Sequence, residues 1–271
     1  MTKIDDATIR FAHRLADASG EVIRPYFRQR IDVIDKGKIM EGAQVFDPVT
    51  AADRGAEEAL RRIITAERPE DGILGEEFGE LAGHSGFRWV LDPVDGTRAF
   101  INGRHEWGSL IALEKDGAPA LGIIDQPVLR ERFIGVNGIA ELHAGGSVER
   151  LRVRPCADIS EAILCATHPY AYFDAGERAA FRKLAQSVRM SRFGGDCYLF
   201  GILAMGFADL VVESHLHRWD VAALIPVVKG AGGIITNWQG RDCSDGGQVV
   251  AAGDARVHKA ALHILNDRHA D

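Results

Sequence analysis

Apolar residues recur every three or four positions near the start of the chain. They form one stripe of six residues: Ile4, Ala7, Phe11, Leu15, Ala18 and Val22. This period predicts an amphipathic helix over residues 4–27, which Pro25 is expected to kink or end. The segment 31–46 lacks such a period and predicts a loop or a loose hairpin. A second helix is predicted from Thr50, whose hydroxyl can cap it with Asp53 in the capping-box position.

From about residue 87 the pattern changes to short apolar runs separated by turn residues. These runs predict strands at 87–91, 109–113, 120–124 and 132–136. Asp-Gly at 116–117 and Asn-Gly at 137–138 are typical of hairpin turns. After about residue 153, short strands alternate with helices expected at 175–188, 198–205, 220–229 and 254–265. The pattern therefore predicts a layered mixture of α and β elements, in two subdomains that face one cleft.

Composition and charge narrow the possible functions. The chain has 271 residues, 46% hydrophobic and 26% charged, which indicates a globular protein rather than a disordered, collagen-like or coiled-coil one. Its formal net charge is −7, and it contains no long basic run. Binding to nucleic acid is not expected, because it needs positive charge to neutralise phosphates. An acidic protein that binds an anionic substrate needs a local source of positive charge, such as metal ions or a helix N-terminus.

The cysteines and the apolar segments suggest a compartment. The four cysteines are too far apart in sequence for a zinc knuckle or a dithiol motif: Cys156, Cys165, Cys197 and Cys243. The N-terminus lacks the apolar core of a signal peptide, and the most apolar stretch, 201–212, is too short to cross a membrane. We therefore expect a cytoplasmic protein with reduced thiols and no membrane partner.

Two carboxylates follow the apolar strand predicted at 87–91. Asp92 and Asp95 are separated by a Pro-Val turn, so their side chains can converge on one point. Oxygen ligands with no His or Cys nearby favour a hard cation, Mg²⁺ before Zn²⁺. The Val94 carbonyl can add a neutral ligand, and the N–H groups of Gly96 and Thr97 suit a phosphate at a helix start. The structural alternative is a solvated acidic turn.

Three further segments place acids at the ends of predicted elements. Glu76 and Glu77 follow a short apolar run, and alone they could be a surface pair. Asp47 precedes the second predicted helix, where capping is an ordinary role. Asp220 follows Trp219 at the start of another helix, where it is either an N-cap or a metal ligand.

Taken in order, these segments match a known pattern of Asp, Glu-Glu, Asp-Pro-x-Asp-Gly/Ser/Ala-Thr and Trp-Asp. Here they are Asp47, Glu76-Glu77, 92–97 and Trp219-Asp220. The chain thus resembles the lithium-sensitive, magnesium-dependent phosphatases of the inositol monophosphatase family. The resemblance implies a homodimer and a mixed α/β fold, the layered αβαβα sandwich shared with fructose-1,6-bisphosphatases. It also implies an N-terminal α+β subdomain, 1–153, with most metal ligands, and a C-terminal α/β subdomain, 154–271, supplying Asp220 and substrate contacts.

The resemblance further implies roles for the acids. Two to three Mg²⁺ ions per active site are expected, held by Glu76, Asp92, the Val94 carbonyl, Asp95 and Asp220. Two metals about 4 Å apart can stabilise both the attacking and the leaving oxygen of a phosphoryl transfer. Thr97, hydrogen-bonded to Asp47 and assisted by Glu76, is expected to activate the attacking water. The amides of Gly96 and Thr97 would bind phosphate, and Glu77 would bond a metal-bound water.

Within the family, residues 87–135 look most like the histidinol-phosphatase branch. Asp196 stands where inositol phosphatases usually carry a small uncharged residue. With Glu213 it can bind the ammonium and imidazole groups of histidinol phosphate. Two alternatives stay open, because Asp196 can instead be a helix N-cap and Glu213 aligns with a position that contacts inositol hydroxyls.

Other polar and aromatic residues have weaker assignments. Arg192, Trp107 and Tyr198 are expected either to line the substrate pocket or simply to pack. His215 and His217 flank Arg218, and we expect surface or packing roles for them rather than metal ligation.

The predicted function is that of a Mg²⁺-dependent phosphomonoester hydrolase. Its predicted substrate is L-histidinol phosphate, which water converts to L-histidinol and phosphate in histidine biosynthesis. Inositol-1-monophosphatase, or another small sugar or nucleotide phosphate phosphatase, is the alternative within the family. A catalytically silent binding protein is a further alternative, which loss of a metal carboxylate or of Thr97 would mark; all of these residues are present.

Overall fold

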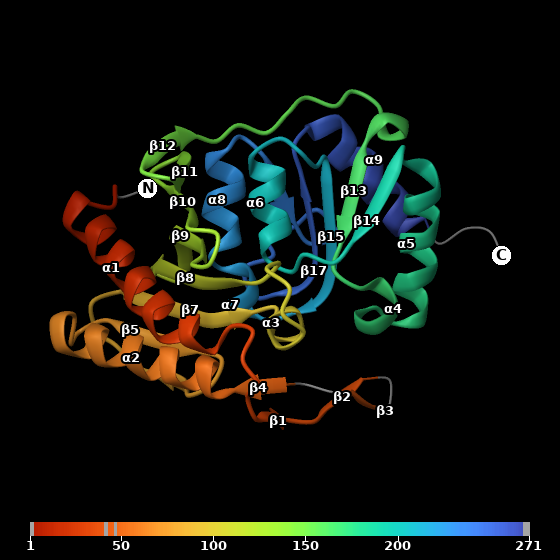
Figure 1. Ribbon diagram of the computed structural model, residues 1–271. Coiled ribbons are helices and arrows are strands. Elements are labelled where there is room, and N and C mark those ends of the chain that lie inside the picture. The colour runs from red at the N-terminus through yellow and green to blue at the C-terminus, as the bar shows by residue number, and fades with distance from the viewer. Residues whose placement is uncertain (1–2, 41–42, 46–47, 268–271) are drawn as a thin grey trace.

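A computed structural model describes residues 3–40, 43–45 and 48–267 of the chain. Five layers follow one another through the molecule, namely helices, a sheet, helices, a second sheet and helices (Figure 1). This arrangement confirms the predicted layered αβαβα sandwich.

Two long helices, α1 (Asp6–Ile23) and α2 (Ala51–Glu67), form the first outer layer. Helix α1 ends where predicted, because Pro25 lies in the 3₁₀ turn η1 (Arg24–Tyr26) that follows it. Its buried face differs from the predicted stripe, since Ala7 is exposed while Ser19 is fully buried. Ser19 tolerates burial because its hydroxyl lies 2.7 Å from that of Ser109, and the two form a hydrogen bond.

The first sheet has eight strands in the order β12-β11-β10-β9-β8-β7-β5-β6. Their bounds are β5 (Gly72–Gly75), β6 (Gly79–Leu81), β7 (Phe87–Asp95), β8 (Gly108–Lys115), β9 (Ala118–Gln126), β10 (Glu131–Val136), β11 (Ile139–Ala144) and β12 (Ser147–Arg150). Neighbouring strands are antiparallel except β5 and β7, which run parallel. Both predicted hairpin turns are confirmed, with Asp116 and Asn137 at positive φ. The sequence pattern did not predict β12, whose residues are all exposed.

The second sheet has five strands in the order β14-β13-β15-β17-β16. They are β13 (Ile163–Ala166), β14 (Met190–Phe193), β15 (Leu210–Leu216), β16 (Ile234–Thr236) and β17 (Gly247–Ala252). The far side carries η2 (Ile159–Glu161), α4 (Pro169–Tyr172), α5 (Ala175–Ser187) and α9 (Ala255–Asn266). Strand β13 pairs parallel with both β14 and β15.

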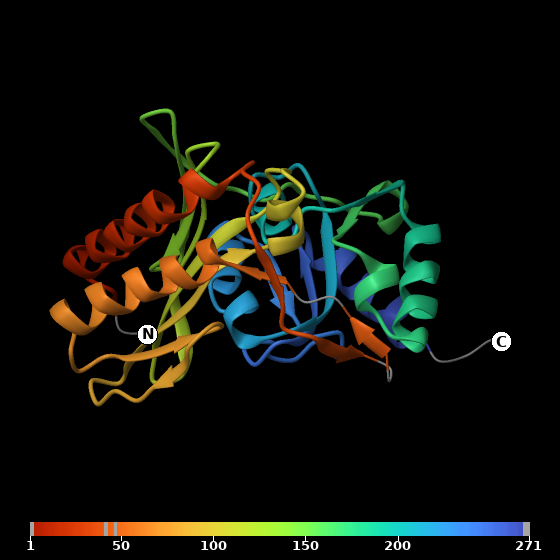
Figure 2. The same cartoon turned by 60° about the horizontal axis from the view of Figure 1, so that its bottom comes forward.

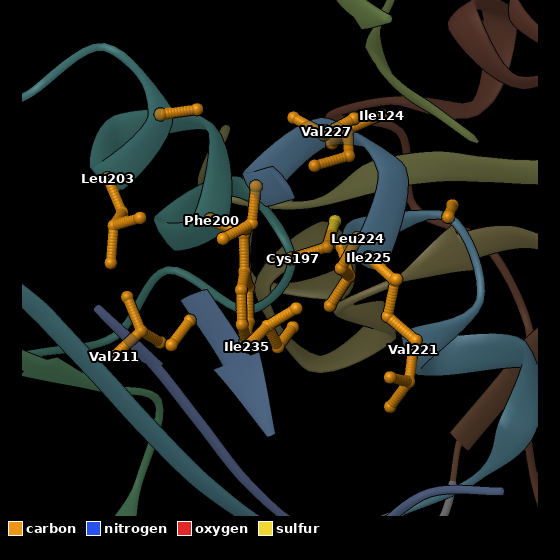
Figure 3. Close-up of a cluster of buried hydrophobic side chains, with 14 of the residues drawn as sticks. Ile124, Cys197, Phe200, Leu203, Val211, Val221, Leu224, Ile225, Val227 and Ile235 are labelled. Carbon is orange, nitrogen blue, oxygen red and sulfur yellow. The ribbon is translucent and has the colours of Figure 1, made fainter. Parts of the chain in front are cut away.

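Four short helices lie nearer the middle: α3 (Thr97–Ile101), α6 (Tyr198–Ala204), α7 (Arg218–Val221) and α8 (Leu224–Gly230). Side chains of α6 and α8 pack together with residues of both sheets, such as Ile124 of β9 and Val211 of β15 (Figure 3). This buried cluster joins residues from both sides of position 153, the predicted subdomain boundary. The division into 1–153 and 154–271 stays a prediction.

Two glycines let the middle layer approach the first sheet closely. A Cβ at Gly122 of β9 would lie 2.0 Å from the Ala223 carbonyl oxygen, and one at Gly135 of β10 would lie 2.1 Å from the Pro226 carbonyl carbon. Only glycine fits such distances, so the start of α8 is held directly against β9 and β10.

The single helix predicted over 220–229 is wrong. The chain forms α7 and then α8, with Ala222 and Ala223 between them. Pro226 explains the break, because it has no N–H to donate to the carbonyl of Ala222 one turn earlier.

The segment predicted as a loop or loose hairpin contains short strands. Strand β1 (Val33–Asp35) pairs antiparallel with β4 (Pro48–Thr50), and β2 (Lys38–Met40) pairs antiparallel with β3 (Ala43–Val45). Figure 2 shows this segment crossing the face of the molecule between the two sheets. Among residues 3–40, 43–45 and 48–267, no helix is both long enough and apolar enough to cross a membrane.

Candidate active site

A cavity of about 480 Å³ lies among β7, β15, α3, α6 and α7. Six acidic residues line it: Glu76, Asp92, Asp95, Asp196, Glu213 and Asp220. The site predicted from separate sequence segments is thus one place in the fold.

The end of β7 brings the first carboxylates together. Its pairing with β8 shifts register between Asp92 and Asp95, forming an irregularity at Pro93, which cannot donate to the ladder. Oxygen atoms of Asp92, Asp95 and Asp220 all lie within 4.8 Å of one another. Glu76 follows β5, the parallel neighbour of β7, and its N–H donates to the Leu91 carbonyl at 3.2 Å. The adjacent ends of these strands place Glu76 beside Asp92.

Helix α7 supplies Asp220 in a role that the sequence analysis did not predict. His217 is the N-cap of this helix, and Asp220 is the third helical residue. Its Oδ2 accepts a hydrogen bond from the His217 N–H at 2.6 Å. The N-cap alternative for Asp220 is therefore wrong, although its carboxylate does support the helix start through this capping box.

Burial and mutual repulsion govern the ionisation of the cluster. Burial raises the pKa of Asp92 well above its usual value, and Glu76, Asp95 and Asp220 add to the rise. Burial, followed by the charge of Asp196, raises the pKa of Asp95 to about 7. Carboxylates held this close together are stabilised by a cation. The set contains only oxygen donors, so these residues fit a hard divalent ion such as Mg²⁺.

Thr97 begins α3, directly after Gly96, whose φ of 89° favours glycine. The Thr97 hydroxyl lies 3.0 Å from the Val94 carbonyl oxygen and 3.2 Å from Oδ1 of Asp53, and it can donate to either. Asp53 also completes the predicted capping box with Thr50, and burial raises its pKa to about 6. From the sequence, Asp53 was predicted to have only this capping role. Asp47, the predicted partner of Thr97, lies outside the described residues, so that hydrogen bond stays a prediction.

Lys36 is a site residue that sequence reasoning missed. Its Nζ lies 2.8 Å from Oε1 of Glu76 and 2.8 Å from Oε1 of Glu77. Burial lowers the pKa of Lys36, but the two glutamates outweigh this and raise it overall. A lysine in a segment without periodicity carries no sequence signal for this contact. Glu77 does not line the cavity; its N–H donates to the buried carboxylate of Glu57 on α2 at 2.8 Å.

Asp196 and Glu213, the predicted substrate residues, both line the cavity. Burial, and then Glu213, raises the pKa of Asp196 to about 7; burial raises that of Glu213 to about 8. Oε1 of Glu213 accepts hydrogen bonds from the Thr167 N–H and hydroxyl, both at 2.7 Å. The N-cap alternative for Asp196 is wrong, because Cys197 occupies that position and its N–H donates to Asp95 at 2.7 Å.

Three other predicted residues do not line the cavity. Arg192 lies on β14, at the edge of the second sheet, so its predicted substrate contact is not supported. Trp107 is fully buried against Phe100, and the Tyr198 hydroxyl donates to Glu131, so both follow the packing alternative.

Two further residues, to which no site role was assigned from the sequence, line the cavity: basic Arg98 and aromatic Tyr172. Arg98 of α3 lies over the ring of Tyr172 of α4, 4.8 Å from its centroid. This cation–π contact joins α3 to α4 across the site. The positive charge of Arg98 also opposes the rise in the pKa of Asp196.

The inositol monophosphatase family model matches residues 5–270. The chain belongs to this family. It is 43% identical to the bifunctional phosphatase IMPL2 of Arabidopsis thaliana, over 94% of this chain and 75% of that protein. It is 36% identical to the histidinol-phosphatase of Chlorobaculum parvum, over 95% of this chain and 96% of the relative.

A solved inositol monophosphatase structure from Zymomonas mobilis is also similar. The two structures align with a TM-score of 0.83, and their sequences are 44% identical. The alignment covers 96% of this chain and 98% of the Zymomonas mobilis chain. The family resemblance inferred from the motifs is thus confirmed, and family members are phosphatases. One of these relatives is named for histidinol phosphate and another for inositol monophosphate. They therefore share a phosphatase family but not one substrate.

Proposed function

We propose that this protein is a Mg²⁺-dependent phosphomonoester hydrolase whose preferred substrate is L-histidinol phosphate. The observation that carries the substrate proposal is that two carboxylates, half-buried Asp196 and buried Glu213, line the same cavity as the metal-type cluster. A leaving group that bears an ammonium and an imidazole can neutralise them, whereas the hydroxyls of inositol supply no charge.

The proposed metal ligands are Glu76, Asp92, the Val94 carbonyl, Asp95 and Asp220, with two to three Mg²⁺ ions per site. When bound, the ions would polarise the phosphate ester and lower the pKa of a water molecule. The other proposed roles belong to residues of the chain itself. The N–H groups of Gly96 and Thr97 bind the phosphate. Glu77 lies outside the cavity and accepts a hydrogen bond from Lys36, so its predicted hydrogen bond to water at the site is not supported.

Thr97, Glu76 and Asp47 are proposed to position the attacking water. The Thr97 hydroxyl is already oriented by two acceptors, the Val94 carbonyl and the Asp53 carboxylate. A hydroxyl whose proton is taken by a carboxylate offers its lone pairs to water, which can place that water in line with the phosphorus atom.

The direct test is Mg²⁺-dependent phosphate release from histidinol phosphate and inositol 1-phosphate, measured side by side with an EDTA control. We expect a preference for histidinol phosphate of about a hundredfold in kcat/KM, equivalent to about 2.7 kcal/mol. A preference for inositol 1-phosphate would keep the metal chemistry and overturn the substrate. If neither ester is hydrolysed in an EDTA-sensitive manner, both the metal-dependent activity and the substrate proposal are overturned.

Asp196→Asn tests the residue that carries the substrate proposal. Asparagine preserves the size of the side chain and tolerates the φ of 44° at this position. We expect the ratio of kcat/KM for histidinol phosphate over inositol 1-phosphate to fall at least tenfold, mainly through KM. Equal losses on both esters would contradict a role in recognising the amine.

Inositol 1-phosphate is the second candidate. Glu213 favours it, because a carboxylate held by Thr167 can also accept hydrogen bonds from hydroxyls, and the Zymomonas mobilis relative bears that name. A homodimeric assembly and a cytoplasmic location remain proposals from the family resemblance. Light scattering on the purified protein tests the first, and fractionation of the source cells tests the second.

A further inference from the structure

His215 has an unusual backbone conformation at the wall of the cavity. Its φ is 59°, in the left-handed region that favours glycine. The pairing of β15 with β17 shifts register between Glu213 and Leu216, so His215 lies in an irregularity of the strand. Such irregularities beside a site re-aim side chains. Unlike Asp116 and Asn137, His215 is not at a hairpin turn, and it lines the cavity together with Glu213.

A carboxylate from another element holds the ring of His215. Its Nε2 lies 3.3 Å from Oε2 of Glu177, on α5. Oε1 of Glu177 accepts from the Ser214 hydroxyl at 2.6 Å and from the Gln248 amide at 2.8 Å. Its Oε2 accepts from the Asp174 N–H at 2.9 Å. Glu177 is therefore fixed on both oxygens and cannot swing away from the imidazole.

This contact determines where the imidazole carries its proton. A deprotonated Nε2 would face a carboxylate oxygen with lone pairs on both sides, so the proton belongs on Nε2. In the neutral ring, Nδ1 is then a hydrogen-bond acceptor. The His215 side chain is 40% exposed and lines the cavity.

We propose that His215 is a specificity-determining residue that contacts the leaving group of the substrate and accepts an N–H or O–H bond from it. The inference rests on the proposed phosphatase activity and adds the third member of a recognition surface with Asp196 and Glu213. The metal-type cluster and the start of α3 are suited to bind the phosphate. The leaving group is the part of the ester left for His215 to contact.

The strain at His215 gives a matched pair of variants. His215→Gly removes the imidazole and suits the backbone, so the protein should unfold at the same temperature as the wild type or above it. His215→Asn also tolerates the left-handed region and keeps an acceptor oxygen. Tyr170→Ala, which alters an exposed ring outside the cavity, serves as the control.

The measurement compares two esters, histidinol phosphate and phenyl phosphate, whose leaving group has no hydrogen-bond donor. For His215→Gly we expect the ratio of kcat/KM for histidinol phosphate over phenyl phosphate to fall about tenfold, through a higher KM for histidinol phosphate. The ratio for His215→Asn should lie between those of His215→Gly and the wild type. An unchanged ratio would overturn the proposal. A lower unfolding temperature with an unchanged ratio would show instead that His215 only ties β15 to α5.

The outcome is separable from that of the proposed function. If the wild type hydrolyses inositol 1-phosphate but not histidinol phosphate, the substrate proposal fails. The ratio of kcat/KM for inositol 1-phosphate over phenyl phosphate then still tests the role of His215. An independent readout is the tautomer of His215, from long-range ¹H–¹⁵N spectra at neutral pH, assigned by the loss of its signals in His215→Asn. A proton on Nδ1 would overturn the proposal.

Discussion

Asp95 is subject to two opposing influences within a few ångströms. Its Oδ2 accepts the N–H of Cys197 at the start of α6, which favours the ionised form. Burial and the nearby carboxylate of Asp196 favour the neutral form and raise its pKa to about 7. A divalent cation would decide in favour of the ionised form while leaving the hydrogen bond to α6 intact. Metal binding and the position of α6 are therefore linked through one side chain.

Thr97 gives a prediction at this scale. Thr97→Val keeps the shape but removes the hydroxyl that lies near Val94 and Asp53, so we expect kcat to fall at least about a hundredfold. Thr97→Ser, the control, should keep most of the activity because it keeps the hydroxyl. Steady-state phosphate release measures both variants. Similar kcat values for valine and wild type would contradict a role in positioning water.

His13 gives a prediction about pH and stability. Burial, and then the charge of Arg132, lowers its pKa to about 4 from the usual 6.5. Between these values the unfolded chain binds a proton that the folded protein does not. Stability contributed by neutral His13 is therefore present above about pH 6.5 and is lost as the pH falls towards 4.

After allowance for its partial exposure, we expect His13 to account for about 1–2 kcal/mol of this loss. Urea unfolding at pH 7 and pH 4.5 measures it. His13→Asn, which keeps an acceptor near Arg132, should reduce the difference between the two pH values. His263→Asn, at an exposed position on α9, is the control and should not. Equal pH dependence in all three proteins would contradict the assignment.

At the scale of elements, α7 is held in place by an ion network centred on the buried Glu114. Arg218 at its start donates to Glu114 of β8 at 2.7 Å and to the Gly117 carbonyl at 2.7 Å, and it also pairs with Asp245. Glu114 is fully buried, and its other oxygen accepts from Arg88 of β7 at 2.8 Å. The network fixes the helix that carries Asp220 against the strand that carries Asp92 and Asp95.

Arg218→Met tests this positioning. It leaves Glu114 buried with one partner fewer, so we expect the free energy of unfolding to fall by about 2–3 kcal/mol. We also expect calorimetry to show Mg²⁺ binding weakened severalfold, because Asp220 is less firmly placed. Arg189→Met, which removes an exposed ion pair with Glu161, should change stability by less than about 0.5 kcal/mol and leave Mg²⁺ binding unchanged. Unchanged Mg²⁺ affinity in Arg218→Met would contradict the positioning role.

At the scale of the whole molecule, the carboxylate cluster joins elements from both sheets, with Asp92 on β7 and Asp220 after β15. Like charges held close together oppose folding, and a cation that binds only the folded state relieves this.

We therefore expect Mg²⁺ at about a hundred times its Kd to stabilise the protein by about 2.7 kcal/mol, or roughly 5 °C in Tm. Differential scanning calorimetry with Mg²⁺ or EDTA, at matched ionic strength, measures the shift. Asp220→Asn should lose most of the shift, and without Mg²⁺ it should unfold at or above the wild-type temperature. A Tm independent of Mg²⁺ in the wild type would contradict the cluster's assignment to a cation.

The sequence alone determined those features that depend on residues close together in the chain. The turn at 92–97 follows from a strand meeting Pro93 and Gly96, the hairpins follow from Asp-Gly and Asn-Gly, and the order of acidic motifs identified the family. The layered fold followed from the same local patterns and from that resemblance. These features depend on residues close together in the chain, whose side-chain periods and backbone preferences are visible in the sequence.

Only the tertiary structure decided which distant groups share an environment. Asp53 faces Thr97 across 44 positions, and Lys36 reaches Glu76 across 40. Asp95, not Asp196, bonds the start of α6 across 102 positions, while Arg192 falls on a sheet edge away from the cavity. Such contacts depend on how sheets and helices pack rather than on local preference. The environment that sets each carboxylate's pKa, and the partner that orients His215, are therefore properties of the folded molecule.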